Sequence, residues 1–515
     1  MEPVLTADQV KALDRRAADL GVRALLLMEG AGRGAAAAIR RLLPAAAGGE
    51  VVAVCGPGGN GGDALCAARW LGLWGGRPWA LVLGEPRGAA ADQARAFAAC
   101  FPDRLVRVSA AEELSALASR LGGADLIIDG ILGVGVKGAA RGLARAAIES
   151  LAAAAAPVVA IDLPSGLAAD SGAVPGPAVE AELTLAMGAL KPCHLLPPAA
   201  ARCGRLEVIQ VPYPPAVWEG EEPGAWVLSD HFCARALPAR SRFGHKGTFG
   251  RVLVVGGAVG MAGAVSLAAA AALRAGAGLV HVLVPEPLYA VVEGAVTEAL
   301  VHPAPAEAGA FAAQAAAAAR TWAEDADVVL LGPGMGRTAG GREVVEALLP
   351  SCPKLVVDAD ALFHLAGSPG LLAGPHGELI LTPHPGEFGR LVGKDPAQVV
   401  ADKIHLARRA ARDWGAVVVL KGPPTAVATP GGEVYLNTTG NTALAHGGAG
   451  DVLAGLIAGL WAGGAALHGA ACAGVFVHGL AADRLCQGRS QRGVLPGDLP
   501  AELPDIFAQL ERREE

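Results

Sequence analysis

Short runs of β-branched and other apolar residues alternate with longer Ala-rich stretches from Val51 to the middle of the 400s, and this alternation constrains the fold most. A parallel sheet buried on both faces needs nearly continuous apolar strands joined by crossover helices. The pattern therefore predicts an α/β chain whose helices cover both faces of parallel sheets. The predicted strands are residues 51–55, 79–83, 126–129, 157–161, 252–255, 279–284, 328–331, 355–358, 379–382 and 417–420.

A Pro-, Gly- and Glu-rich segment interrupts the alternation between residues 212 and 224. The chain has 515 residues, too many for one hydrophobic core, and a segment of this composition is typical of an interdomain linker. We therefore predict an N-terminal domain over residues 1–213, a linker over 214–226 and a C-terminal domain over 227–515.

Charge and cysteine usage narrow the class of protein. The net charge of -7, with no basic run, argues against nucleic acid as a partner, and none of the nine cysteines forms a C-x-x-C pair. Thr6 and Gln9 have the spacing of a helix capping box, which does not suit a secretory signal. The apolar stretch 452–467 lacks Lys or Arg flanks, so we interpret it as core and expect no membrane span. We expect a cytoplasmic enzyme acting on small molecules, and the Ala-rich helices of both domains favour a homo-oligomer.

Gly447-Gly448-Ala449-Gly450-Asp451 is the most informative segment for function. Residues with small side chains let backbone N–H groups converge on a phosphate, and the helix that follows adds its positive end. Asp451 could take a proton from a hydroxyl group there. The segment therefore predicts phosphate chemistry.

Three polar clusters follow predicted strands in the N-terminal domain: Gly56–Asp63, Asp129–Gly135 and Asp162–Gly166. Ligand sites of doubly wound sheets form at the carboxyl ends of strands, so we expect the three clusters to meet. Asp162, directly after the predicted strand 157–161, could cap the Pro-Ser-Gly turn.

Asn60-Gly61-Gly62-Asp63, Asp162–Gly166 and Gly188-Ala189-Leu190-Lys191-Pro192 resemble the Rossmann-like epimerase half of the bifunctional NAD(P)H-hydrate repair enzymes. The resemblance implies that Asn60, Asp129 and Ser165 bind K⁺ and that Asp162 moves a proton as the R and S hydrates (NADHX and NADPHX) interconvert. It further implies substrate contacts at Gly59, Asn60, Gly61, Gly62, Asp63, Gly133, Val134, Gly135, Val136, Lys137, Gly138, Ala139 and Asp162. The chain departs from the family loop at Gly59, which replaces Asn, and at Ala64, which replaces Gly and reduces backbone freedom.

The C-terminal domain resembles the ribokinase-like α/β/α dehydratase of the same enzymes over nearly its whole length. The matching motifs are Lys246–Gly250, Gly256–Ala258, Met261–Ala264, Ala275–Gly278, Gly332–Gly336, Asp358–Leu362, Thr382–Glu387 and Lys421-Gly422. The resemblance implies that ADP or ATP phosphorylates the C6 hydroxyl of the S hydrate with the help of Mg²⁺. Phosphate then leaves and NADH or NADPH is restored.

The same resemblance assigns residues to this reaction. Ala264, Gly336, His384 and Asp451 would contact the hydrate, and Asp451 would deprotonate its hydroxyl. The nucleotide would contact Lys421, Gly422, Pro423, Pro424, Thr425, Gly447, Gly448, Ala449 and Gly450. Glu387 is better explained as a carboxylate at a helix start. The family's Thr and Ser are replaced by His446 and Ala449, which leaves the backbone donors in place.

Two other functions fit parts of the sequence. A ribokinase-like kinase of a vitamin or sugar alcohol would share the Gly-Ala-Gly-Asp device. The N-terminal domain could instead be a binding module without catalysis. The residues do not decide between ADP and ATP, or between NADHX and NADPHX.

Overall fold

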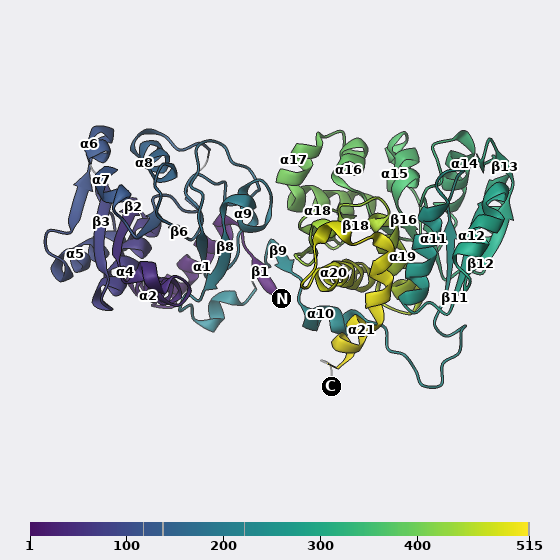
Figure 1. Cartoon of the computed structure of the whole chain (residues 1–515), viewed down its shortest axis with the longest axis horizontal. Coiled ribbons are helices and arrows are strands. Elements are labelled where there is room, and N and C mark those ends of the chain that lie inside the picture. Colours follow the sequence, from purple (N-terminus) through teal and green to yellow (C-terminus); the bar gives the residue numbers. More distant parts are fainter. Residues whose placement is uncertain (117, 136–137, 221, 513–515) are drawn as a thin grey trace. The chain divides into compact units, whose positions relative to one another are not determined.

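The protein is described here by a computed structural model covering residues 1–116, 118–135, 138–220 and 222–512. The chain divides into two compact units (Figure 1). The N-terminal unit comprises Glu2–Gly224 with Val400–Asp402, and the C-terminal unit comprises Ala225–Val399 with Lys403–Glu515.

The N-terminal unit contains a seven-stranded parallel sheet in the order β4-β3-β2-β5-β6-β7-β8. Its strands are β2 (Glu50–Cys55), β3 (Arg77–Leu83), β4 (Leu105–Val108), β5 (Leu126–Gly130), β6 (Val158–Ile161), β7 (Leu183–Met187) and β8 (Arg205–Ile209). The direction of strand succession reverses between β2 and β5, and such a switch point is where doubly wound sheets bind ligands.

Helices cover both faces of this sheet, because alternate residues of each buried strand point to opposite sides. Val51 and Ala53 pack on one side in the same cluster as α2 (Ala24–Leu42), α4 (Gly59–Leu73) and α5 (Ala89–Cys100). Val52 and Val54 pack on the other side with α6 (Ala111–Ala116), α7 (Ala118–Gly122) and α8 (Gly142–Ala152). The capping box predicted at Thr6 is confirmed and begins α1 (Ala7–Asp19).

The C-terminal unit is built on a larger sheet in the order β9-β20-β19-β18-β17-β16-β15-β10-β11-β12. Its strands are β9 (Ala225–Val227), β10 (Arg251–Val255), β11 (Leu279–Pro285), β12 (Leu300–Ala304), β15 (Val328–Leu331), β16 (Lys354–Val357), β17 (Glu378–Leu381), β18 (Val417–Leu420), β19 (Thr425–Ala428) and β20 (Val434–Asn437). The predicted parallel arrangement is confirmed from β12 to β18, whereas β18–β19 and β19–β20 pair antiparallel. Residues 430–432 are Pro-Gly-Gly, and the Thr429 N–H donates to the Glu433 carbonyl at 2.9 Å. This tight turn joins β19 to the antiparallel β20.

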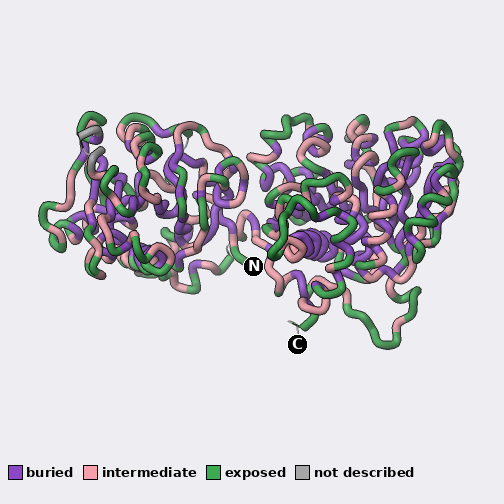
Figure 2. The backbone as a smooth tube through the Cα atoms, in the orientation of Figure 1, coloured by how far each residue is buried: buried purple, intermediate pink, exposed green. Residues whose placement is uncertain are grey.

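A helical layer on one face of this sheet forms the main core with β10 and its neighbours. It contains α10 (Asp230–Ala236), α11 (Ala262–Arg274), α12 (Tyr289–Ala295), α19 (Ala449–Ala462), α20 (Leu467–Leu485) and α21 (Leu499–Glu511). α19 and α20 are buried along most of their length (Figure 2). The interpretation of the apolar stretch after Asp451 as core is therefore confirmed. Among the described residues, no helix combines the length and apolar character needed to cross a bilayer.

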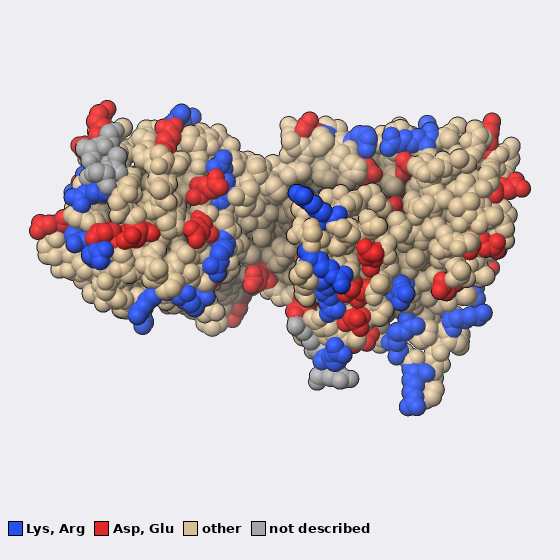
Figure 3. All heavy atoms as spheres, in the orientation of Figure 1, with Lys and Arg blue, Asp and Glu red and all other residues tan. Residues whose placement is uncertain are grey.

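The opposite face is covered by helices outside that core cluster. α13 (Ala315–Ala323) contacts β10, and α18 (Lys403–Trp414) contacts β18. Between them in the chain lie α14 (Ala339–Leu348), α15 (Ala359–Ala366), α16 (Pro385–Val392) and α17 (Pro396–Ala401). On the face drawn in Figure 3, Lys and Arg side chains alternate with Asp and Glu side chains over both units.

Candidate active sites

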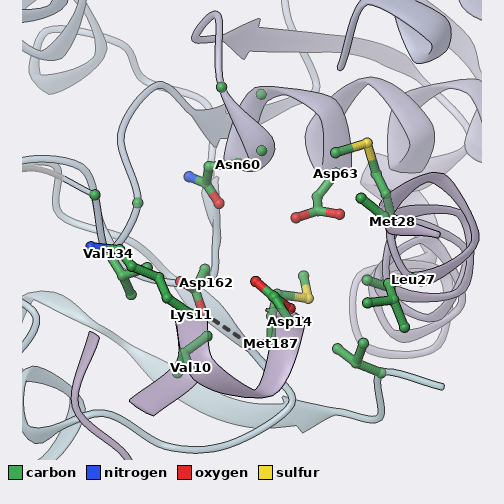
Figure 4. A pocket seen from close by; sticks show the side chains of 18 of the residues that line it. Val10, Lys11, Asp14, Leu27, Met28, Asn60, Asp63, Val134, Asp162 and Met187 are labelled. Atoms are coloured by element: carbon green, nitrogen blue, oxygen red, sulfur yellow. Dashed lines mark hydrogen bonds between the residues drawn. The ribbon is translucent and has the colours of Figure 1, made fainter. Parts of the chain in front are cut away.

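A cavity of about 540 Å³ opens at the switch point of the N-terminal sheet. Its lining comes from α1, α2, the start of α4, the segment after β5, and the ends of β6 and β7 (Figure 4). The three polar clusters predicted to meet all contribute to it, through Asn60, Gly133 and Asp162 among others. The prediction that they share one site is therefore confirmed.

The start of α4 forms one wall of the cavity. The sequence was interpreted as a loop over Asn60–Asp63, but these residues form the first turn of the helix after the N-cap Gly58. Glycine is required at position 61, because a Cβ there would lie 1.9 Å from the Gly56 carbonyl oxygen. A first helical turn leaves backbone N–H groups unpaired and carries a partial positive charge. This wall is therefore suited to an anionic ligand such as a phosphate.

Asn60, Asp129 and Ser165 come together beside Leu132. The Asn60 Nδ2 donates to the Leu132 carbonyl at 2.9 Å, and the Ser165 hydroxyl donates to Asp129 Oδ1 at 2.6 Å. Asp129 is fully buried, and burial raises its pKa to about 6 although Ser165 and Ile131 donate hydrogen bonds to it. Among the residues that the structure describes, the buried Asn60 Oδ1 has no hydrogen-bond partner. An unpaired amide oxygen, a buried carboxylate and a hydroxyl fit a hard cation.

Asp162 follows β6 with a left-handed backbone, at φ 66°. Its Oδ1 accepts a hydrogen bond from the Met187 N–H at 3.1 Å and an ion pair from the Lys191 ammonium. Lys191 is fully buried and also donates to the Met187 carbonyl at 2.8 Å. The sequence motif that ends in Lys191-Pro192 was recognised, but its lysine was not assigned to the site. Asp162 thus faces the cavity as one half of a buried ion pair rather than as a turn cap alone.

Part of the segment after β5 lines the cavity. Gly133, Val134 and Gly135 line it, whereas Val136 and Lys137 lie outside the described residues. Farther along the chain, Gly138 has a left-handed φ of 81°. Ala139 packs beside Gly176, because a Cβ added to Gly176 would lie 2.9 Å from the Ala139 Cβ.

The substitution at Ala64 is explained by its position. Ala64 lies inside α4 and is fully buried, so no left-handed backbone is needed there. Its methyl group faces Gly130, where a Cβ would approach it to 2.4 Å. The reduced backbone freedom expected at Ala64 therefore does not disturb the start of the helix.

The C-terminal site forms where β15, β16, β17 and β18 end side by side. The Lys421 N–H donates to the Pro383 carbonyl at 2.9 Å, which joins the segment after β18 to the segment after β17. The Lys421 Nζ donates to Asp358 Oδ1, after β16, at 2.8 Å. Asp358 is buried, and its carboxylate raises the pKa of Lys421 against the effect of burial. Lys421 is therefore half-buried beside a buried carboxylate, and Asp358 is a residue that sequence analysis did not assign to the site.

The start of α19 completes this site. Gly448 is the N-cap with a left-handed φ of 101°, so Ala449, Gly450 and Asp451 form the first helical turn. A Cβ at Gly450 would lie 3.3 Å from Lys421 Nζ and 3.8 Å from Asp358 Oδ2. The cradle, the lysine and its carboxylate partner are therefore neighbours. Burial and then the Asp358 charge raise the pKa of Asp451 to about 7, while Lys421 opposes the shift.

His384 and Glu387 cap α16 together. The Gly386 N–H donates to His384 Nδ1 at 3.0 Å, and the His384 N–H donates to Glu387 Oε2 at 2.8 Å. The interpretation of Glu387 as a helix-start carboxylate is confirmed. The His384 side chain is 52% exposed, and its Nε2 lies 3.5 Å from Glu387 Oε1.

Gly336 and Ala264 approach each other through neighbouring residues. Gly336 has a left-handed φ of 79°, and its N–H donates to Asp360 Oδ2 at 3.0 Å. A Cβ at Gly334 would lie 3.0 Å from the Ala264 methyl group. The two segments predicted to contact the hydrate therefore lie side by side.

Lys403 is a further buried lysine that the sequence did not reveal. Its Nζ donates to the carbonyls of Lys421, Gly422 and Pro424 at 3.2, 3.0 and 2.8 Å. Burial lowers its pKa to about 7. Lys403 thus fixes the backbone of the 421–424 segment, which is predicted to bind the nucleotide. The sequence pattern could have placed Lys403 in an amphipathic helix, but it could not have shown these three contacts.

Acidic residues near Asp451 do not form a metal cage. Among the described residues, no group of three or more His, Cys, Asp or Glu side chains is arranged to hold a metal ion. Mg²⁺ commonly uses substrate phosphates with few protein ligands, so the arrangement is compatible with a metal that arrives on a nucleotide.

Comparison with known proteins identifies the family. A model of NAD(P)H-hydrate dehydratase matches residues 252–505, and a model of the YjeF-related protein N-terminus matches residues 24–193. The bifunctional NAD(P)H-hydrate repair enzyme Nnr of Moorella thermoacetica is 38% identical over 519 residues, covering 99% of this chain and 98% of that protein. The chain belongs to the family of bifunctional NAD(P)H-hydrate repair enzymes.

Other relatives show the same relationship. The Nnr repair enzyme of Escherichia coli is 34% identical and covers 97% of this chain and 93% of its own length. The ADP/ATP-dependent NAD(P)H-hydrate dehydratase of Bacillus subtilis, co-crystallized with ATP/Mg²⁺, is 29% identical with a TM-score of 0.48, covering 56% of this chain and 99% of that one. Because the repair enzymes match both units, family membership favours repair over a kinase with a non-catalytic N-terminal module.

Proposed function

We infer that the chain repairs hydrated NADH and NADPH, and we propose that its two sites perform successive steps. The N-terminal cavity interconverts the R and S hydrates, and the site at Gly450 dehydrates the S form at the expense of ADP or ATP. The observation that supports this division best is the meeting of Lys421, Asp358 and the start of α19 at one sheet edge. A kinase-like site of this kind can turn a poor leaving group, a hydroxyl, into a good one.

In the N-terminal site, the unpaired N–H groups of Gly59, Asn60 and Gly61 bind the substrate diphosphate, and the segment Gly133–Gly135 encloses the hydrated ring. Asp162 moves a proton at the C6 hydroxyl. Lys191 and the Met187 N–H fix the Asp162 carboxylate in place for this transfer.

K⁺ is proposed to lie between Asn60, Asp129 and Ser165, where it would supply the positive charge that the buried Asp129 lacks. Its binding can be measured without an activity assay. We expect KCl to raise the thermal unfolding midpoint more than choline chloride at equal ionic strength, and Asp129→Asn to abolish the difference. Equal midpoints for the unsubstituted chain in both salts would rule out this site.

In the C-terminal site, Lys421–Thr425 and Gly447–Gly450 bind the nucleotide, and Ala264, Gly336 and His384 hold the S hydrate beside Asp451. Asp451 removes the C6 hydroxyl proton as the oxygen attacks the terminal phosphoryl group, and the backbone N–H groups of α19 stabilise the charge that develops. Loss of phosphate from C6 and of a proton from the neighbouring carbon then restores the reduced ring. Mg²⁺ would neutralise charge on the phosphoryl oxygens when bound.

The proposal is tested by incubating purified protein with mixed R and S NADHX and either ADP or ATP. We expect the absorbance of reduced nicotinamide to return in full with at least one of the two nucleotides, and to stay absent without either. Stable accumulation of a phosphorylated alcohol instead would favour a kinase. Repeating the assay with NADPHX decides the substrate preference.

A further inference from the structure

Three carboxylates face the N-terminal cavity, and each has different surroundings (Figure 4). Asp162 is paired with Lys191, and Asp14 Oδ1 accepts a hydrogen bond from the Tyr213 hydroxyl at 2.7 Å. Asp63, the fifth residue of α4, makes no hydrogen bond or ion pair within the part of the chain that the structure describes. Its carboxyl group therefore faces the ligand space with neither oxygen engaged by a described residue, whereas Asp162 and Asp14 each use Oδ1 in a contact.

The surroundings of Asp63 favour its neutral form. Burial, followed by the charges of Asp162 and Asp14, raises the pKa of Asp63 well above its ordinary value, and Lys191 only partly offsets this. Lys11 and Tyr213 are the other ionisable side chains in the cavity lining. The Asp162 carboxylate, in contrast, is held by the Lys191 ammonium. An acid and a base are commonly supplied by two titratable groups in different surroundings.

We propose that Asp63 is a second catalytic residue of the epimerase site, a carboxylic acid that works from α4 together with the Asp162 carboxylate across the cavity. This inference rests on the proposed epimerase function of the N-terminal unit. It adds to that function the group that donates the proton.

The chemistry of inversion needs both groups. Asp63 gives its proton to the C6 hydroxyl oxygen, the C6–O bond breaks, and its electron pair leaves with the oxygen as water. The lone pair of the ring nitrogen forms a double bond to C6. Water then adds to C6 from the opposite face, the nitrogen recovers its electron pair, and Asp162 takes the proton that this water loses. One water leaves and one enters, and no oxidant or reductant is required; in the reverse direction the two carboxyl groups exchange roles.

The decisive variant is Asp63→Asn, which keeps the shape of the side chain but cannot donate an acidic proton. We expect kcat for R-to-S conversion to fall about 10²- to 10⁴-fold while KM changes little. Any residual activity should lose the decline at high pH that marks deprotonation of the acid. Asp92→Asn, on the exposed surface of α5, is the matched control and should retain the original kinetics. Dehydration of pure S hydrate should be unchanged in both variants, which shows that the chain is folded.

The outcomes separate this inference from the function on which it rests. If the unsubstituted chain does not interconvert the hydrates, the proposed epimerase function fails. If it does, and Asp63→Asn retains its kcat and pH profile, Asp63 is not the acid and the epimerase function stands. Infrared spectroscopy of the full chain gives a direct check at neutral pH. We expect Asp63→Asn to remove a protonated-carboxyl band, and an unchanged spectrum in that region would overturn the inference.

Discussion

Both sites place a carboxylate near a lysine at the carboxyl ends of parallel strands. The carboxylate that contacts the lysine differs between the two sites. In the N-terminal unit, Lys191 contacts Asp162 itself. In the C-terminal unit, Lys421 contacts Asp358, and Asp451 lies nearby with a pKa raised to about 7. The comparison shows that the same two residue types are used differently: the lysine holds the cavity-facing carboxylate itself in one site and a neighbouring carboxylate in the other.

The largest effect should come from removing the base of the C-terminal site. Asp451→Asn should lower dehydration of S-NADHX by about 10²- to 10⁴-fold, because an amide cannot accept the hydroxyl proton. Nucleotide binding, measured by calorimetry, should remain, since the cradle consists of backbone N–H groups. Asp505→Asn, on the exposed surface of α21, serves as the control. Full activity of Asp451→Asn would remove this residue from the chemistry.

Breaking the N-terminal ion pair should affect stability as well as activity. Lys191→Met leaves the Asp162 carboxylate without its cation, and loss of one partner of a buried pair costs about 3–5 kcal/mol. The free energy of unfolding in urea measures this loss, and epimerase activity should fall with it. The double variant Lys191→Met with Asp162→Asn should recover much of the stability. An unchanged unfolding midpoint for Lys191→Met would show that the pair is not formed.

Lys403 should matter to the nucleotide rather than to the chemical step. Lys403→Met keeps the length of the side chain but leaves three carbonyls of the 421–424 segment unpaired, at a cost of about 1–3 kcal/mol. We expect KM for ADP or ATP to rise about tenfold while kcat changes less. Lys394→Met, at an exposed position, is the matched control. A fall in kcat alone would contradict a positioning role.

The pH profile should distinguish the C-terminal carboxylate. Asp451 must be ionised to act as a base, and its raised pKa of about 7 means that it is protonated below that pH. Dehydratase kcat/KM should therefore fall about tenfold for each pH unit below 7 and level off above it. A profile measured on pure S hydrate that stays flat between about pH 5.5 and 8 would contradict this assignment.

The sequence predicted the buried strands well because they are continuous β-branched runs. β2, β10 and β18 each carry three or four valine or leucine residues with almost no polar interruption. β4, β7, β8, β9, β12, β19 and β20 were not predicted, because they are short or because small or polar residues interrupt their apolar runs. Such runs give periodicity and composition little signal, even where the strand lies inside the sheet, as β19 and β20 do between β18 and β9.

Site residues could be predicted where a backbone turn requires a particular residue type. Gly61 and Gly448 belong to this class, because packing or a left-handed backbone excludes larger side chains. The partners of the lysines could not be predicted in the same way. Lys421 and Asp358 are 63 positions apart and meet only because β18 and β16 end at the same sheet edge. Such pairings depend on strand order, which no local pattern records.

The central claim is that two sites act in sequence on the two hydrates, and a mixed pool of R- and S-NADHX tests it most directly. With ADP or ATP, the unsubstituted chain should convert the whole pool to NADH, whereas Asp162→Ala should stop once the S fraction is consumed. Further conversion should then proceed only at the enzyme-free rate of epimerisation. Complete conversion by Asp162→Ala at the rate of the unsubstituted chain would contradict the account.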